Sequence, residues 1–381
     1  MKFIHCADLH LGSQAQSSLL KPDRIRRDLM LTFKKILDLG RREEIDLLLI
    51  CGDFIESHQI DRRGLREIRE ALEVARDFEV IVVCGNHDPF GAASIYQDYF
   101  DSVEGLHIIP GGAVQRLDFP NLDCSILAYS FANPYLDESV VPQARDFEDL
   151  LPIKIGMVHG EIDDRQQGRY NPIPQSLIAS SGLDYLALGH IHLSNAYDGP
   201  PQVGTTYYAW PGIPQGRHFK ESGEKGVLLG EIRPDSRLEL DFVPMANCRF
   251  FDDRFNVELY KKKSELVEAI FEKYRDQDPE QIVLRLRLFG WMDEAENFEV
   301  LSLQESLASR FAALELIDER RLRWDLEKMR SEVNLRGIFV NLLLEAIEAS
   351  SDELLRKRYE AALDYGLRAI SEEERLVDDY S

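Results

Sequence analysis

Five short runs of apolar residues recur along the first half of the chain. Each predicts a buried β-strand, because a strand in a sheet that is covered on both faces has no polar side and is apolar throughout. Several are rich in β-branched residues, which favour strands. None continues into a helix-like pattern; each ends abruptly in Gly, Asp, Asn or His. The runs occupy residues 2–6, 45–50, 80–84, 153–158 and 184–188.

Between the first three runs the apolar positions change to a helical spacing. Pro22 and Asp23 are typical of a first helical turn, and the following stripe predicts a helix to about Glu44. Alternation of strand and helix predicts a mainly parallel sheet. Short alternating strands over 105–131 predict a second sheet, which 207–227 would close. The stripes are Ile25, Leu29, Phe33, Ile36 and Leu37, and then Leu65, Ile68 and Leu72.

Polar side chains follow all five strands. A single such stretch would be best explained as a turn that caps a strand, but five repeats favour one shared site, because ligands of α/β proteins bind at the carboxyl ends of strands. Two side chains two residues apart at a strand end share one face. The residues are Asp8 and His10, Asp53, Asn86 with His87 and Asp88, His159, and His190 with His192.

These motifs resemble those of the calcineurin-like metallophosphoesterases: Asp-Leu-His, Gly-Asp, Gly-Asn-His-Asp, His-Gly and Gly-His-Ile-His all stand in order. The stretches HCADLHLGS, YLALGHIH and WPGIPQGRHFKESGEKGVLLGEI are more narrowly similar to the SbcD-type DNA repair nucleases and their YhaO-like group. The resemblance covers about the first two-thirds of the chain. It implies a four-layer α/β/β/α sandwich.

The resemblance also implies a two-metal site. Mixed carboxylate, imidazole and amide ligands suit Mn²⁺, Fe²⁺ or Zn²⁺, and of these we expect Mn²⁺. His87 would be the general acid and Asp88 would orient its imidazole. One metal would be held by Asp8, His10, Asp53 and His192, and the other by Asp53, Asn86, His159 and His190.

Arg217 and His218 lie in the segment QGRHFKE. An arginine beside such a site can grip phosphate with two hydrogen bonds, so we consider both residues candidates for substrate binding. The alternative interpretation, which the pattern favours, is an ordinary surface turn. His5, in the first strand, either supports the metal ligands or is a core histidine whose ring nitrogens are hydrogen-bonded.

Net charge complicates the choice of substrate. The chain of 381 residues carries −23, and residues 1–245 hold 24 Lys and Arg against 37 Asp and Glu. Residues 246–381 hold 21 against 31. A protein that binds DNA alone usually has a basic face. We therefore expect weak DNA binding without a partner.

The metal motifs end near residue 245, which predicts three domains. Residues 1–245 would be the metallophosphoesterase nuclease domain, 246–332 a small α/β capping domain, and 333–381 two amphipathic helices with an acidic, disordered tail. The predicted helices cover 338–349 and 352–370. By resemblance to SbcD-type nucleases, they would bind an SMC-like ATPase of the SbcC type; packing on the capping domain is the alternative.

The sequence thus predicts a metal-dependent nuclease that hydrolyses DNA with a metal-activated hydroxide and acts in DNA repair. A phosphodiesterase or phosphatase for small phosphoesters is the alternative, and a non-catalytic DNA-end or ATPase-binding subunit is a third. Five cysteines without a Cys-x-x-Cys pair indicate reduced thiols. With a strand at residue 2 we expect no signal peptide or membrane span, hence a cytoplasmic protein. Whether it forms a homodimer stays open.

Overall fold

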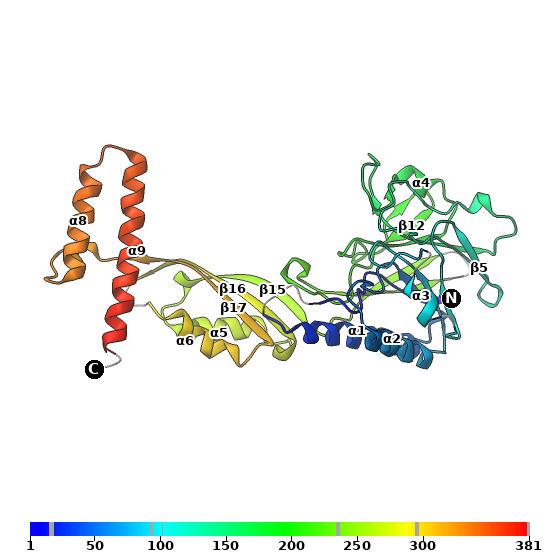
Figure 1. Ribbon diagram of the computed structural model, residues 1–381, viewed down its shortest axis with the longest axis horizontal. Coiled ribbons are helices and arrows are strands. Elements are labelled where there is room, and N and C mark those ends of the chain that lie inside the picture. Colours follow the sequence, from blue (N-terminus) through cyan, green and yellow to red (C-terminus); the bar gives the residue numbers. More distant parts are fainter. Residues whose placement is uncertain (15–18, 92–93, 101, 234–236, 294–296, 379–381) are drawn as a thin grey trace. The chain divides into compact units, whose positions relative to one another are not determined.

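The computed structural model describes residues 1–14, 19–91, 94–100, 102–233, 237–293 and 297–378. Two compact units make up the chain (Figure 1). The first comprises Met1–Asp252, Gln277–Arg285 and Arg310–Leu314, and the second Asp253–Asp276, Leu286–Ser309 and Glu315–Ser381. Among the described residues, no helix has the length and apolar character needed to cross a membrane.

The first unit contains two six-stranded sheets. In one, β1, β2, β3 and β4 run parallel, while β13 pairs antiparallel with β1 and β14 with β13. We expected residues up to 227 to close the second sheet, but β13 begins at Gly226 and extends the first. The strands, in sheet order, are β14 (Leu238–Pro244), β13 (Gly226–Ile232), β1 (Lys2–Cys6), β2 (Leu47–Cys51), β3 (Glu79–Val83) and β4 (Leu106–Ile108).

The second sheet has a parallel centre with an antiparallel strand at each edge. This confirms a mixed α/β fold in which most strands are parallel. The strands of the second sheet lie in the order β11 (Gln202–Val203), β12 (Thr206–Ala209), β10 (Tyr185–Gly189), β7 (Ile153–His159), β6 (Cys124–Ala128) and β5 (Gln115–Phe119). A separate two-stranded ribbon follows β7 and consists of β8 (Glu161–Ile162) and β9 (Pro172–Ile173).

The core between the two sheets follows from the period of two along each strand. Leu47, Leu49 and Cys51 of β2 pack inward with Ile155 and Met157 of β7. The alternate residues of β2 face the helices on the outer side. All five cysteines are buried and unpaired.

Helices cover the two sheets unequally. The first sheet is covered by α1 (Pro22–Glu43) and α2 (Arg62–Val74), which lie side by side, together with α3 (Ile95–Tyr99) (Figure 1). Over the second sheet, the described part of the chain forms the five-residue α4 (Gln175–Ala179), and loops supply much of the fourth layer.

The second unit combines α5 (Lys263–Lys273) and α6 (Val300–Ala308) with most of a three-stranded sheet, in the order β15 (Arg249–Asn256), β16 (Ile282–Asp293) and β17 (Ala313–Arg323). Helix α6 begins at Val300, and Glu299 is its N-cap.

The C-terminal part folds into α7 (Leu326–Arg330), α8 (Leu335–Ala349) and α9 (Glu353–Asp378). Asp352 caps α9 by accepting hydrogen bonds from the backbone N–H groups of Leu354 and Leu355. The acidic segment expected to be disordered continues α9 to Asp378, since Glu and Arg are good helix formers. The domain boundaries 245 and 332 stay predictions.

Candidate functional site

Seven candidate metal ligands stand at the carboxyl ends of five parallel strands in the two sheets. Strand β1 leads to two of them, β2, β3 and β7 provide one each, and β10 leads to two. Four of the seven have a positive φ, an uncommon conformation for residues with a side chain that is found where function requires a fixed direction. These four are Asp8, His10, Asp53 and His190, with φ of 53°, 45°, 48° and 92°.

Two motif glycines leave the space that the ligands occupy. Gly52 has φ 86°, and a Cβ there would lie 2.2 Å from Nδ1 of His159. A Cβ on Gly85 would lie 2.3 Å from Oδ1 of Asp53. The Gly-Asp and Gly-Asn-His-Asp motifs therefore need glycine for close approach of the backbone to the ligands.

Asp53 lies at the centre of the cluster. Its Oδ2 is 3.7 Å from Nε2 of His10 and 3.6 Å from Nε2 of His159. On one side Asp8 Oδ1 is 3.9 Å from His192 Nε2, and on the other His159 Nε2 is 3.1 Å from Asn86 Oδ1. The structure thus brings both predicted ligand sets together around one shared carboxylate.

His190 completes the second set. Its ring centroid is 5.2 Å from that of His159, and its backbone N–H donates to Asp8 at 3.0 Å. The two sets are therefore linked through the backbone of a candidate ligand as well as through Asp53.

The donor groups fit divalent cations. Neither ring nitrogen of the buried His10 makes a well-aligned hydrogen bond with any described residue, although Oε2 of Glu56 lies 3.4 Å from its Nδ1. Burial lowers the pKa of His10 to about 4, which keeps the ring in the neutral form that binds metals. Burial, and then the charge of Asp53, raises the pKa of Asp8 well above its ordinary range. A cation would supply the missing opposite charge.

His87 lies beside the cluster with its side chain 44% exposed. Its Nδ1 is 3.0 Å from Oε1 of Glu56, and its backbone N–H donates to Asp53 at 2.8 Å. The hydrogen bond with Glu56 raises the pKa of His87 above its ordinary value, against the effect of burial. The position suits proton donation, although its ring also lies within metal-ligand reach of His10 and Asp53.

Asp88 does not orient His87 as we predicted. Its carboxylate accepts hydrogen bonds from the backbone N–H groups of Asp53, Phe54, Ile55 and Gly85, and from the hydroxyl of Tyr96 at 2.5 Å. The four backbone donors belong to the two turns that carry Asp53 and Asn86, and Tyr96 belongs to α3. Asp88 therefore fixes backbone, and Glu56 is the carboxylate that faces the His87 imidazole.

Arg217 and His218 both face Glu221. The Arg217 guanidinium donates to Oε1 of Glu221 at 2.7 Å, and Nε2 of His218 is 3.5 Å from the same oxygen. Glu221 Oε1 also lies 3.0 Å from Nδ1 of the candidate ligand His192. The pair therefore helps to hold a ligand by way of Glu221. A direct grip on phosphate stays a prediction.

His5 lies behind the site and is fully buried. Its Nδ1 is 2.7 Å from the Tyr185 hydroxyl and its Nε2 is 3.1 Å from the Leu188 carbonyl. The imidazole is thus hydrogen-bonded at both nitrogens, which fits the interpretation as a core histidine. It ties β1 to β10 directly below the residues that these strands deliver.

An α/β sandwich whose strand ends combine carboxylate, imidazole and amide groups is the architecture of a metal-dependent phosphoesterase. Residues 1–194 match the family model of the calcineurin-like phosphoesterases. That match spans half of the chain, and the protein belongs to this family.

Related proteins extend the likeness beyond the matched region. The chain is 27% identical to the metallophosphoesterase YhaO of Bacillus subtilis, over 92% of this chain and 88% of that protein. It is 24% identical to the DNA double-strand break repair protein Mre11 of Archaeoglobus fulgidus, over 100% of this chain and 89% of that protein. A dimetal phosphatase from Danio rerio aligns with a TM-score of 0.43 and 12% identity, over 65% of this chain and 98% of that structure.

Proposed function

We propose that this protein is a two-metal phosphodiesterase that hydrolyses DNA in repair. The observation that carries the proposal is the position of Asp53 between two sets of candidate ligands. Asp8, His10 and His192 would complete one metal site, and Asn86, His159 and His190 the other. Two divalent cations, when bound, supply positive charge for phosphoryl oxygens and lower the pKa of a water. Mn²⁺ is the metal that we propose.

The chain's own residues supply the rest of the chemistry. His87 would donate a proton to the leaving alkoxide, because its ring is partly exposed and held by Glu56. Asp88 would keep the turn around Asp53 rigid through its backbone hydrogen bonds. This arrangement argues against a non-catalytic subunit, which would not need a polar imidazole held beside the ligands.

The choice of DNA as substrate is supported by the relatives, several of which are named as DNA double-strand break repair proteins. The net charge of −23 instead favours small phosphoesters, the second candidate. An acidic chain can act on DNA when a partner supplies the basic surface.

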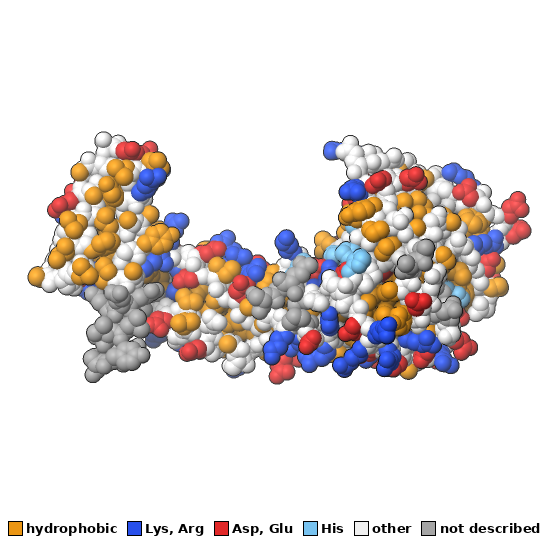
Figure 2. Space-filling model, viewed as in Figure 1, with side chains coloured by type: hydrophobic (Ala, Val, Ile, Leu, Met, Phe, Trp, Pro, Cys, Tyr) orange, Lys and Arg blue, Asp and Glu red, His pale blue; other side chains and the backbone are white. Residues whose placement is uncertain are grey.

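We propose an SMC-like ATPase as that partner, bound through α8. The hairpin of α8 and α9 has its own core, which includes Val340, Leu363 and Leu367. Ile338 and Leu342 of α8 are about 60% exposed, at 59% and 62%. Figure 2 shows hydrophobic side chains gathered over these two helices. An exposed apolar helix face suits a groove or coiled coil.

The test is hydrolysis of linear duplex, single-stranded and hairpin DNA with Mn²⁺, beside a generic small diester. We expect Mn²⁺-dependent cleavage of DNA that chelation abolishes. Cleavage of the small diester alone would favour the second candidate. Metal-independent activity, or none on any ester, would contradict the proposal.

A further inference from the structure

An aromatic stack leads outward from the metal-ligand cluster. The ring of Tyr170 lies 5.0 Å from that of His190 with an angle of 37° between the planes. Tyr135 follows, 5.9 Å from Tyr170 and tilted by 34°. The guanidinium of Arg169 sits 4.2 Å from the centre of the Tyr135 ring, a cation–π contact. Four planar groups therefore form a continuous series that begins at a candidate ligand.

The stack is held in place by the backbone. Leu136 donates its N–H to the Arg169 carbonyl at 3.0 Å, and its carbonyl accepts from Asn171 N–H at 2.8 Å. These two hydrogen bonds join the segment that carries Tyr135 to the one that carries Tyr170. Both rings are thus fixed relative to each other rather than borne on independent loops.

A buried side chain connects the stack to the metal site. Asn171 is fully buried; its Oδ1 accepts from Val140 N–H at 2.7 Å, and its Nδ2 donates to the His159 carbonyl at 3.1 Å. His159 is a candidate ligand. The position of the two tyrosines is therefore set by the same framework that sets the ligands.

The outer end of the stack is open to solvent. Tyr135 is 51% exposed and the Arg169 side chain 64%. An exposed aromatic ring beside an arginine offers a flat apolar face and a positive charge together. That combination is what proteins present to the bases and phosphates of single-stranded nucleic acid.

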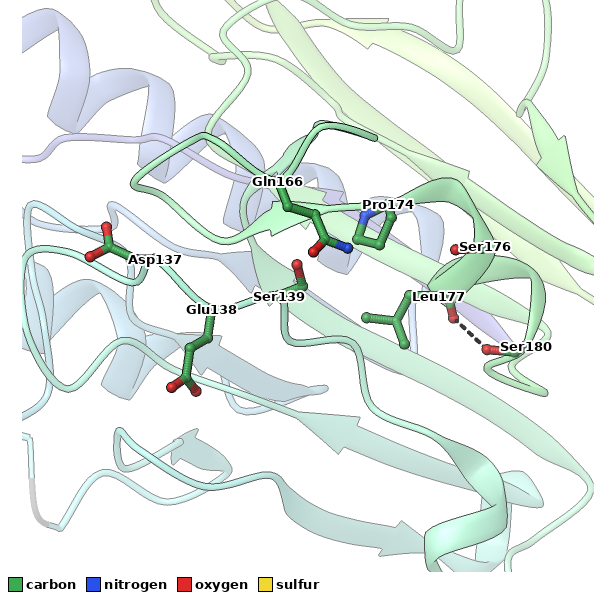
Figure 3. Close-up of a pocket in the computed structure, with 8 residues that line it drawn as sticks. All are labelled: Asp137, Glu138, Ser139, Gln166, Pro174, Ser176, Leu177 and Ser180. Carbon is green, nitrogen blue, oxygen red and sulfur yellow. Dashed lines mark hydrogen bonds between the residues drawn. The ribbon is translucent and has the colours of Figure 1, made fainter.

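Acidic groups border the stack. Asp137 lies 3.8 Å from Arg169. With Glu138 it also lines a hollow of about 710 Å³ that includes Ser139 and Gln166 but none of the seven candidate ligands (Figure 3). These carboxylates disfavour phosphates in the hollow. Affinity at this end must therefore come from contact with an uncharged base more than from charge.

We propose that Tyr135, Tyr170 and Arg169 form a nucleoside subsite, in which a base stacks on the tyrosine pair while its phosphodiester lies at the metal cluster. The inference rests on the proposed function and makes it more specific. A base inside a duplex is already stacked on its neighbours, so the subsite selects single-stranded or frayed DNA ends.

The decisive experiment compares two esters that release the same leaving group. One is the p-nitrophenyl ester of thymidine 5′-phosphate, and the other is methyl p-nitrophenyl phosphate, which has no base. Tyr135→Ala should raise KM for the thymidine ester about tenfold, since a stacked base contributes roughly 1–3 kcal/mol. KM for the methyl ester and kcat for both should not change. Tyr135→Phe should restore the wild-type KM.

Tyr365→Ala, which removes an exposed tyrosine from α9, is the matched control and should have no effect on either ester. Equal effects of Tyr135→Ala on both esters, or no effect on either, would overturn the subsite and leave the phosphodiesterase assignment intact. Binding is measured separately with Mn²⁺ on oligothymidylate and on an abasic strand of equal length. Wild-type protein should prefer the strand with bases, and Tyr135→Ala should not. Equal binding by the wild type would overturn the subsite even if no ester were hydrolysed.

Discussion

Glu56 and His87 form a carboxylate–imidazole pair with 3.0 Å between Oε1 and Nδ1, at the edge of the candidate metal cluster. The second oxygen of Glu56 lies 3.4 Å from Nδ1 of His10. One side chain therefore faces both the proposed acid and a proposed ligand. Burial opposes the charge on Glu56, yet the contacts with His10 and His87 hold the pKa of Glu56 below its ordinary value.

Glu56→Gln should lower turnover by about 10–100-fold, because groups that orient ligands and acids typically have effects of this size. Steady-state kinetics with a DNA substrate and metal analysis would measure both roles. Glu67→Gln, which alters an exposed pair with Lys34, is the control and should behave as wild type. Unchanged turnover in Glu56→Gln would remove Glu56 from the mechanism.

His87→Gln should retain metal but lose roughly 10²–10⁴ in rate, the usual contribution of general acid catalysis. The loss should shrink for a p-nitrophenyl ester, whose leaving group needs little protonation. Metal content and rate are measured on the same preparation. Because His87 also lies near His10 and Asp53, loss of a metal in this variant would reassign it as a ligand.

The candidate ligands could be predicted from sequence because the relevant physics is local. An apolar run specifies a strand, and parallel strands bring their carboxyl ends to one edge, so Asp53 and His159 meet although 106 positions separate them in the sequence. The family resemblance then divided the residues between two metals. The shared position of Asp53 agrees with that division.

Residues around the ligands were harder to predict, because a hydrogen bond between loops leaves no periodic pattern. Glu56 lies in a loop after β2, and Tyr96 reaches Asp88 from α3. We predict from the sequence that Asp88 orients His87, as carboxylates often orient an imidazole, whereas the Asp88 carboxylate faces backbone 33–35 residues away. Such partners depend on how the two turns pack.

For the C-terminal helices, too, the sequence did not reveal which side chains contact other parts of the chain. The helices predicted for partner binding contain Ile347, Leu363 and Leu367, which are buried within the hairpin. Ile338 and Leu342 of α8 and Leu355 of α9 are exposed instead. Periodicity identifies an apolar face, but it does not say whether a neighbouring helix of the same chain covers that face.

Leu342→Glu should weaken binding of the SMC-like ATPase at least tenfold and leave hydrolysis of a small diester unchanged. Removal of residues 333–381 is harder to interpret, because Met329 of α7 packs in the hairpin core and the truncation would expose it to solvent. Leu259→Glu places the same charge at another exposed leucine and should bind normally. If Leu342→Glu also binds as wild type does, α8 is not the docking face.

DNA binding by the isolated protein should depend only weakly on salt. Few phosphate contacts release few counterions, so the slope of log K against log salt concentration should be shallower than about −2 for single strands. A titration between low and physiological salt measures it. A steep slope with tight binding would reveal a concentrated basic face.

The central claim is that Asp53 is shared by two metals that make this chain a phosphodiesterase, and Asp53→Asn tests it most directly. Metal content and Mn²⁺-dependent hydrolysis of single-stranded DNA are measured together on the wild type, on Asp53→Asn and on Asp38→Asn, which changes an exposed aspartate of α1. Wild type and Asp38→Asn should bind two metals per chain and cleave DNA, and Asp53→Asn should lose metal and all measurable turnover. Two bound metals with near wild-type cleavage in Asp53→Asn would contradict the account.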